Sequence, residues 1–299
     1  MITRRCLPLI WGVTLAAPRI TGAQCPESCL VAVRALKLDS LPGPVPTYYS
    51  SGFQTRARLD QALLREEERF FADSLRLGTG IRLALLNETD WKRVNAYPYG
   101  LPNVDTDDRV AFLPATDDGV ITMDFLHREP TLSDTVRAKI TREGVTYGEF
   151  ARSITDVIGL HEVGHTYVIS YGIKPHAKWF NEFLASYSAV VFLQTTRPRQ
   201  ARLIEAMIEA RFEQPPPTHT SLEDFEQLYI QVGPENYNWY QALFLQRIVE
   251  VSPSQGLGFL RAVRAAFPMA EPDSVSLGSV LDRLERIYPG FRVWAGRRR

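Results

Sequence analysis

The chain has 299 residues, of which 45% are apolar and 23% are charged, and its 34 basic residues balance its 34 acidic residues. This composition is typical of a globular protein and excludes a disordered or fibrous chain. A balanced chain without clustered positive charge lacks the surface with which proteins neutralise nucleic-acid phosphates, so nucleic acid is not an expected partner. No repeat or shift of composition divides the sequence, which favours one folded unit.

The first 23 residues have the layout of a signal peptide. Arg4 and Arg5 precede an apolar run over residues 6–17, and small residues follow up to Ala23. The run has about a dozen residues, whereas a membrane-spanning helix needs about 20, so we expect cleavage after Ala23 and no stable membrane insertion. A retained anchor and a buried N-terminal helix are the alternatives. The prediction is an exported protein, either secreted or periplasmic.

Cleavage would remove Cys6 and leave Cys25 and Cys29 close to the new N-terminus. An oxidising compartment would favour a small disulfide loop between them. Gln24 precedes Cys25, where a bacterial lipoprotein signal has a small residue, so lipidation is not expected.

The following segment, residues 24–54, is expected to be an extended leader, because it contains the helix-breaking sequence Pro-Gly-Pro-Val-Pro. After it, an amphipathic pattern predicts a helix over residues 55–77, ended by glycines. Short apolar runs between loops rich in Pro, Asp and Asn predict strands over residues 81–86, 110–113 and 119–125.

The remainder has helical periodicity, interrupted by prolines. Strands followed by helices predict an α+β fold: one domain over residues 55–299, with a sheet-containing part at about 55–145 and a helical part at about 146–299. The predicted helices span residues 148–171, 178–195, 199–212, 239–251, 256–267 and 276–287.

The first of these helices carries the pattern His161-Glu162-Val163-Gly164-His165. Two imidazoles four residues apart on a helix point the same way and can chelate one zinc ion, while the adjacent Glu162 carboxylate can act on a water molecule. A lone histidine on an apolar face is more often a packed core residue. The complete five-residue pattern, however, favours a metal site.

A third metal ligand is expected on the next helix, in the sequence Trp179-Phe180-Asn181-Glu182-Phe183-Leu184-Ala185-Ser186-Tyr187. Two antiparallel helices joined by a short turn can bring the Glu182 carboxylate to the two histidines. The result would be a site of two histidines and one glutamate with one open coordination position, as in catalytic zinc sites.

This constellation resembles the gluzincins, the zinc metallopeptidases that include thermolysin and the aminopeptidase N group. The pattern Trp-x-Asn-Glu-x-x-Ala-x-Tyr at residues 179–187 is similar to the second helix of the aminopeptidase N branch. The resemblance implies a zincin-like catalytic domain that holds one zinc ion per chain through His161, His165 and Glu182, with Glu162 as the general base. It covers residues 161–187 closely, and by order of elements about residues 119–250.

The aminopeptidase element Gly-x-Met-Glu-Asn, which anchors a free amine, is not found in the corresponding upstream sequence, Gly119-Val120-Ile121-Thr122-Met123-Asp124. A third histidine at metzincin spacing is also missing. The expected activity is therefore hydrolysis of a peptide or protein substrate, with the predicted strand at residues 119–125 as a place where the substrate backbone could add to the sheet.

In the resembled families a tyrosine or histidine beyond the third ligand stabilises the oxyanion. Tyr237 and Tyr240 are the candidates here, because they lie three residues apart at the start of an apolar helix. Packing is the alternative role for both, and Tyr147 and His176 are the next candidates.

Two other function classes stay open. One is a zinc hydrolase of a non-peptide substrate, and the other is a catalytically silent zinc-containing binding module. The presence of Glu162 favours an enzyme, since an inert metal site has no use for a carboxylate there.

Overall fold

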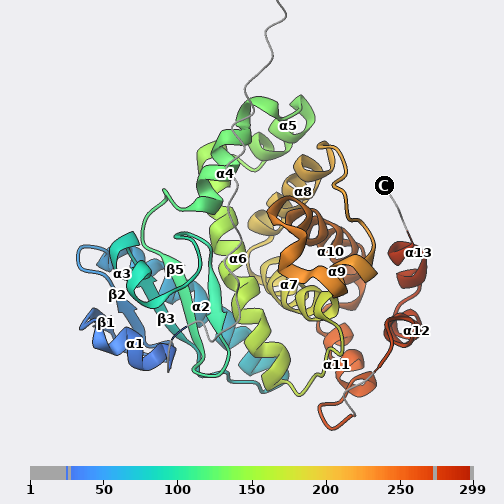
Figure 1. Cartoon of the computed structure of the whole chain (residues 1–299), viewed down its shortest axis with the longest axis horizontal. Coiled ribbons are helices and arrows are strands. Elements are labelled where there is room, and N and C mark those ends of the chain that lie inside the picture. Colours follow the sequence, from blue (N-terminus) through green and yellow to red (C-terminus); the bar gives the residue numbers. More distant parts are fainter. Residues whose placement is uncertain (1–24, 26–27, 272–274, 297–299) are drawn as a thin grey trace, which may run out of the picture.

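The computed structural model describes residue 25, residues 28–271 and residues 275–296. A five-stranded mixed sheet lies beside a larger set of helices (Figure 1). The predicted α+β class is therefore confirmed. The predicted signal peptide, residues 1–23, lies outside the described residues. Within the described part of the chain, no helix is both long enough and apolar enough to cross a membrane.

The sheet has parallel strands at its centre and an antiparallel strand at each edge. Both faces of the central strand β3 are covered: Leu83 and Leu85 belong to the main core, whereas Ala84 and Leu86 belong to a second cluster with Trp91. In spatial order the strands are β1 (Asp39–Leu41), β2 (Thr47–Tyr49), β3 (Arg82–Leu86), β5 (Val110–Pro114) and β4 (Asn103–Asp105).

The expectation of an extended leader over residues 24–54 is wrong for most of its length. This segment contributes helix α1 (Cys29–Ala35) and both strands of the β1–β2 hairpin. The strands are three residues long, too short for their periodicity to be recognised in the sequence, and they exist because β3 offers β2 a parallel partner. Cys25 and Cys29 form a disulfide.

The strand expected at residues 119–125 is also wrong, because this segment forms helix α4 (Val120–Arg128). Ile121 and Phe125, four residues apart, pack into a cluster with the start of α6. Asp124 and Arg128, again four apart, form an ion pair. A short apolar run is compatible with a strand or a buried helix, and the packing decided in favour of the helix.

Four more helical elements precede α6 in the chain, of which α5 packs against α6 and α8 rather than against the sheet. They are α2 (Gln54–Leu75), which corresponds to the helix predicted at residues 55–77, α3 (Glu88–Val94), the 3₁₀ turn η1 (Glu129–Thr131) and α5 (Asp134–Arg142).

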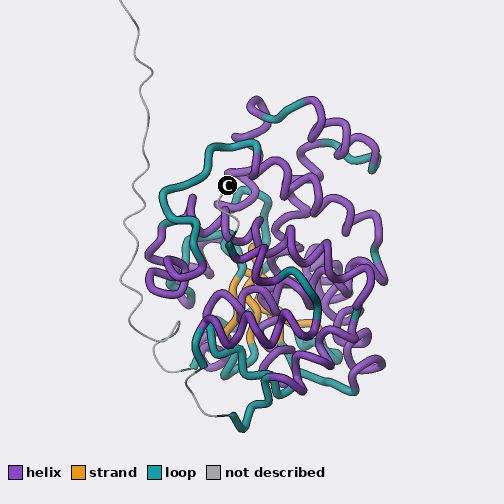
Figure 2. The backbone as a smooth tube through the Cα atoms, turned by 90° about the vertical axis from the view of Figure 1, so that its right-hand side faces the viewer, coloured by secondary structure: helices purple, strands orange, loops and turns teal. Residues whose placement is uncertain are grey.

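The helical half contains the six helices predicted from the sequence, one of them longer than expected, and also helical segments at residues 222–232 and 291–295 that were not predicted. Helix α6 runs between the sheet and the other helices (Figure 1), and Figure 2, turned toward the helical side, shows the strands among and behind them. The elements are α6 (Tyr147–Ser170), α7 (Lys178–Thr196), α8 (Pro198–Phe212), α9 (Leu222–Leu228), η2 (Tyr229–Val232), α10 (Pro234–Gln255), α11 (Leu257–Ala266), α12 (Leu277–Ile287) and α13 (Phe291–Ala295).

Two local features set the position of α6. Its start is fixed by a capping box, in which the Thr146 hydroxyl accepts from the Glu149 N–H and the Glu149 carboxylate accepts from the Thr146 N–H. Its approach to α7 depends on Gly164, where an added Cβ would lie 2.5 Å from the carbonyl oxygen of Ala185. The glycine inside the two-histidine pattern therefore lets the two helices come close together.

Candidate metal centre

His161, His165 and Glu182 converge in the contact between α6 and α7. His161 Nε2 lies 3.2 Å from Glu182 Oε2, and His165 Nε2 lies 3.8 Å from Glu182 Oε1. One ligand atom from each residue lies within 4.8 Å of the other two. Bonds of about 2.0–2.1 Å in a tetrahedron place two ligand atoms roughly 3.3 Å apart. The spacing and the chemistry of the donors therefore suit a metal ion, and this group could hold one.

The far side of each imidazole is held by a residue of α7. His161 Nδ1 lies 2.8 Å from the Ser186 hydroxyl, and His165 Nδ1 lies 3.1 Å from the Asn181 side-chain amide. A metal ion bound through Nε2 would leave the proton of each ring on Nδ1. Ser186 Oγ would then accept from His161, and the Asn181 amide, whose nitrogen faces His165 Nδ1, would have to turn its oxygen toward that ring. Such partners fix the ring orientation and the tautomer of a metal-binding histidine.

Glu182 is surrounded by hydrogen-bond donors. Tyr229 donates to Oε1 over 2.7 Å, and Tyr237 and Gln241 each donate to Oε2 over 2.9 Å. The Ser186 hydroxyl donates to Gln241 Oε1 over 3.5 Å, so a chain of contacts joins the His161 ring to the Glu182 carboxylate. Both oxygens of this carboxylate are thus oriented before any ligand binds.

Tyr229 reaches Glu182 from an unusual backbone conformation, with φ 49° and ψ −122°. A bulky residue pays about 1–3 kcal/mol for such a conformation, and residues of this kind cluster at functional sites. The conformation lies where α9 ends and the 3₁₀ segment η2 begins.

The charges of the centre suit metal binding. Burial by itself raises the pKa of Glu182, but the neighbouring histidines and the hydrogen bond from Tyr229 outweigh it and hold the pKa below its ordinary value. Burial lowers the pKa of His165 to about 4, so this imidazole is neutral near pH 7. The pKa of His161 is raised, because the Glu182 hydrogen bond and the Glu162 charge outweigh burial. The ionised Glu182 carboxylate and the neutral His165 imidazole are the forms that bind a metal ion, and His161 would release its proton on binding.

Glu162 stands beside this group without belonging to it. Its Oε1 lies 3.8 Å from His161 Nε2, and its carboxylate accepts a hydrogen bond from the Val104 N–H of β4. Burial and the charge of Glu182 raise the pKa of Glu162 to about 7, against the opposing effects of His161 and Val104. A carboxylate poised near neutral pH is suited to accept and return a proton.

The two tyrosines proposed as oxyanion donors, Tyr237 and Tyr240, contact different groups. Tyr237 contacts Glu182, as stated above, whereas the fully buried Tyr240 donates its hydroxyl to the Ser221 carbonyl oxygen. The reserve candidates are bound elsewhere: the Tyr147 hydroxyl donates to the Phe125 carbonyl, and His176 Nε2 pairs with Glu271.

Several residues that contact the candidate ligands were not predicted from the sequence. Asn181 and Ser186 could have been found, because they lie one residue before and four residues after Glu182 on the same helix. Gln241 lies four residues after Tyr237 and shares its helix face. Tyr229 offered no such signal, since its position depends on the bend after α9.

Comparison of the chain with protein-family models, with curated proteins and with solved structures gives no match.

Proposed function

We propose that this protein is a zinc-dependent hydrolase that cleaves peptide bonds, with a zincin-like catalytic domain of gluzincin type. The observation that carries the proposal is the approach of His161, His165 and Glu182 to one another with the Glu162 carboxylate beside them. The two imidazole nitrogens and one carboxylate oxygen favour zinc over the oxygen-rich sites of magnesium and calcium. A bound zinc ion would polarise the carbonyl group of the substrate and would lower the pKa of a water molecule.

The role of Glu162 follows from its position. Its carboxylate accepts a proton from the attacking water and returns that proton to the leaving nitrogen. A pKa of about 7 allows both transfers near neutral pH. The hydrogen bond from Val104 orients the carboxylate without neutralising it.

A peptide substrate is favoured by strand β4, which is an edge of the described sheet. The Val104 N–H points to Glu162, so the unpaired edge of β4 faces the base. An extended peptide that adds to this edge would lie alongside Glu162. This edge takes the place of the segment at residues 119–125, which is helical.

The proposal includes export to an oxidising compartment, either outside the cell or in a periplasm. The Cys25–Cys29 disulfide supports it, because such bonds persist in oxidising surroundings.

Metal analysis combined with a single isostere tests the function. We expect one zinc ion per chain, and Glu162→Gln should keep this ion and the fold while hydrolysis of a peptide library falls by about 10²- to 10⁴-fold. The control is Glu205→Gln, which changes an exposed carboxylate on α8 and should turn over like the parent.

Undiminished hydrolysis by Glu162→Gln at equal zinc content would exclude the proposed mechanism. A zinc-loaded parent that cleaves esters but no member of the peptide library would point to a non-peptide substrate instead.

A further inference from the structure

The turn between α6 and α7 sets where Glu182 stands relative to the two histidines. Helix α6 ends at Ser170 and α7 begins at Lys178, so residues 171–177 carry the chain from one ligand helix to the other. The N-cap residue of α7, Ala177, makes no side-chain hydrogen bond to the first N–H groups of the helix. The start of α7 therefore depends on contacts from other parts of the chain.

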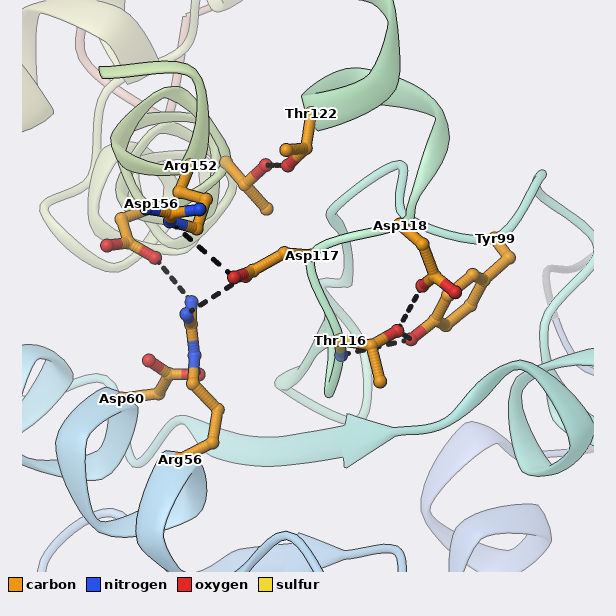
Figure 3. Close-up of polar contacts among 10 residues, drawn as sticks. Arg56, Asp60, Tyr99, Thr116, Asp117, Asp118, Thr122, Arg152 and Asp156 are labelled. Atoms are coloured by element: carbon orange, nitrogen blue, oxygen red, sulfur yellow. Dashed lines mark hydrogen bonds and ion pairs between the residues drawn. The ribbon is translucent and has the colours of Figure 1, made fainter. Parts of the chain in front are cut away.

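Helix α6 is anchored independently of this turn (Figure 3). Arg56 of α2 donates to Asp156 of α6 over 2.7 Å. The hydroxyl of Thr122 in α4 lies 3.0 Å from the hydroxyl of Thr155 in α6. Both contacts lie within two helical turns before His161. The helix that carries the histidines is thus held by α2 and α4, and the position of α7 against it needs a restraint of its own.

His176 lies in the turn, and its side chain is fully buried. Its Nε2 lies 3.0 Å from Glu271 Oε2, and the Arg283 guanidinium donates to the two oxygens of Glu271 over 2.7 Å and 2.6 Å. The bonds from Arg283 and then from His176 lower the pKa of Glu271 to about 2. The Glu271 carboxylate is therefore ionised and only accepts, so the His176 Nε2–H donates to it.

The segment that binds His176 also packs on α7. Residues 172–174 and 267–269 pair through two main-chain hydrogen bonds, of 3.0 Å and 3.1 Å, and one isolated bridge. The Phe267 ring contacts both the imidazole and the first turn of α7, with centroid distances of 6.2 Å to His176 and 4.9 Å to Phe180. The turn, this distant segment and the start of α7 thus form one packed unit.

Glu226 of α9 also reaches the start of α7. Its side chain accepts from the Lys178 N–H and its carbonyl accepts from Lys178 Nζ, both over 2.8 Å. These contacts are exposed to solvent, where charged pairs stabilise little. The buried contact of His176 with Glu271 is therefore the stronger restraint.

His176 has a left-handed backbone conformation, with φ 59°. Glycine and asparagine adopt this conformation most readily. The backbone of the turn alone therefore does not require a histidine, and the contact that distinguishes the residue is the one from its imidazole to Glu271.

We propose that His176 is a positioning residue of the metal centre: its bond to Glu271 fixes the start of α7 and thereby places Glu182 opposite the two histidines. The role rests on the proposed zinc site. Asn181, which contacts His165, lies in the same first turn and moves with Glu182. Metal ligands must be held within about 0.5 Å of their productive geometry, so a small displacement at the turn is enough to weaken the site.

Two amides of different length test the contact. The side-chain nitrogen of His176→Gln can reach Glu271 as the imidazole Nε2 does, whereas that of His176→Asn is one bond shorter, although asparagine suits the left-handed backbone better. We measure zinc affinity against a competing chelator. His176→Gln should stay close to the parent, and His176→Asn should bind zinc about 10-fold more weakly. An affinity of His176→Asn equal to or above that of His176→Gln would show that only the turn conformation matters, and would overturn the proposal.

Val33→Ala is the control for a general loss of stability. Val33 is buried on α1, in the core cluster on the other face of the sheet. Its truncation should lower the free energy of unfolding and leave zinc affinity unchanged. Weaker zinc binding by Val33→Ala would show that affinity merely follows stability, and would also overturn the proposal.

Hydrogen exchange of the metal-free chain separates the role of His176 from the proposed function. The Asn181 N–H donates to the Ala177 carbonyl in the first turn of α7, and it should exchange faster in His176→Asn than in His176→Gln. Equal exchange rates would overturn the proposal even if the chain binds no zinc. A chain that binds zinc and cleaves no peptide would remove the proposed reaction and leave the role of His176 intact.

Discussion

Two carboxylates of this protein are equally buried and have opposite surroundings. Glu182, in the contact between α6 and α7, is 1% exposed, and Glu67 on α2 is 0% exposed. Glu182 receives hydrogen bonds from two phenols and one amide, with two imidazoles alongside. Neither oxygen of Glu67 has a hydrogen-bond partner within the described residues.

The surroundings set the charge of each group. Burial and the neighbouring Glu68 raise the pKa of Glu67 well above its ordinary value, so Glu67 holds its proton to a higher pH than an exposed glutamate does. The donors around Glu182 lower its pKa despite equal burial. Glu67 belongs to the buried face of α2, which also contains Leu64 and Phe71. A buried carboxylate stays ionised only where donors compensate for the loss of water.

The largest expected effect comes from removing the charge of the compensated carboxylate. Glu182→Gln should lower zinc affinity by more than about 100-fold, since loss of a mere supporting contact costs about 10- to 100-fold. Hydrolysis should fall with the metal content. Titration with zinc in the presence of a competing chelator measures the affinity, and unchanged zinc binding would show that another residue is the third ligand.

The next effect is a change in the pH dependence of stability, caused by the Glu67 carboxyl group, which lacks hydrogen-bond partners within the described residues. The folded pKa of Glu67 is raised, so the unfolded chain releases this proton first, and stability falls as the pH rises above about 4.3, the ordinary glutamate value. Glu67→Gln removes this loss. The free energy of unfolding of the variant relative to the parent should therefore increase by up to about 1.4 kcal/mol per pH unit above that point.

Urea unfolding at several pH values between about 5 and 8 measures this difference, and the test is the slope of the free-energy difference against pH. Glu66→Gln is the control, because Glu66 lies on the same helix in a partly exposed pair with Arg197 and should change stability by no more than about 1 kcal/mol. A parallel pH dependence of the parent and Glu67→Gln would mean that Glu67 is ionised in the folded protein.

The smallest effect comes from removing one of the donors to Glu182. Tyr229→Phe should weaken zinc binding by about 10-fold and leave the fold intact, because Tyr237 and Gln241 continue to orient the carboxylate. Tyr240→Phe is the matched control, since its hydroxyl donates to Ser221 instead. Equal zinc affinity of the Tyr229→Phe and Tyr240→Phe variants would show that the Tyr229 hydroxyl does not support the ligand.

Local patterns in the sequence were enough to predict the helices that carry the proposed metal ligands. A spacing of four residues places His161 and His165 on one face through helix geometry alone, and a short turn leaves Glu182 few places other than the opposite helix. Gly164, between the two histidines, also indicates a close approach of another helix, because close packing of two helices requires a small residue. These features are local, so chain connectivity was enough to predict them.

Contacts between distant segments settle which groups surround the proposed ligands and which apolar runs become strands. Residues 119–125 form a helix because α6 offers an apolar partner, and β1 and β2 exist because β3 offers a parallel one. Tyr229 reaches Glu182 from a segment far from it in sequence. Pairing between distant segments depends on which partner each surface finds after folding, and no local periodicity encodes that choice.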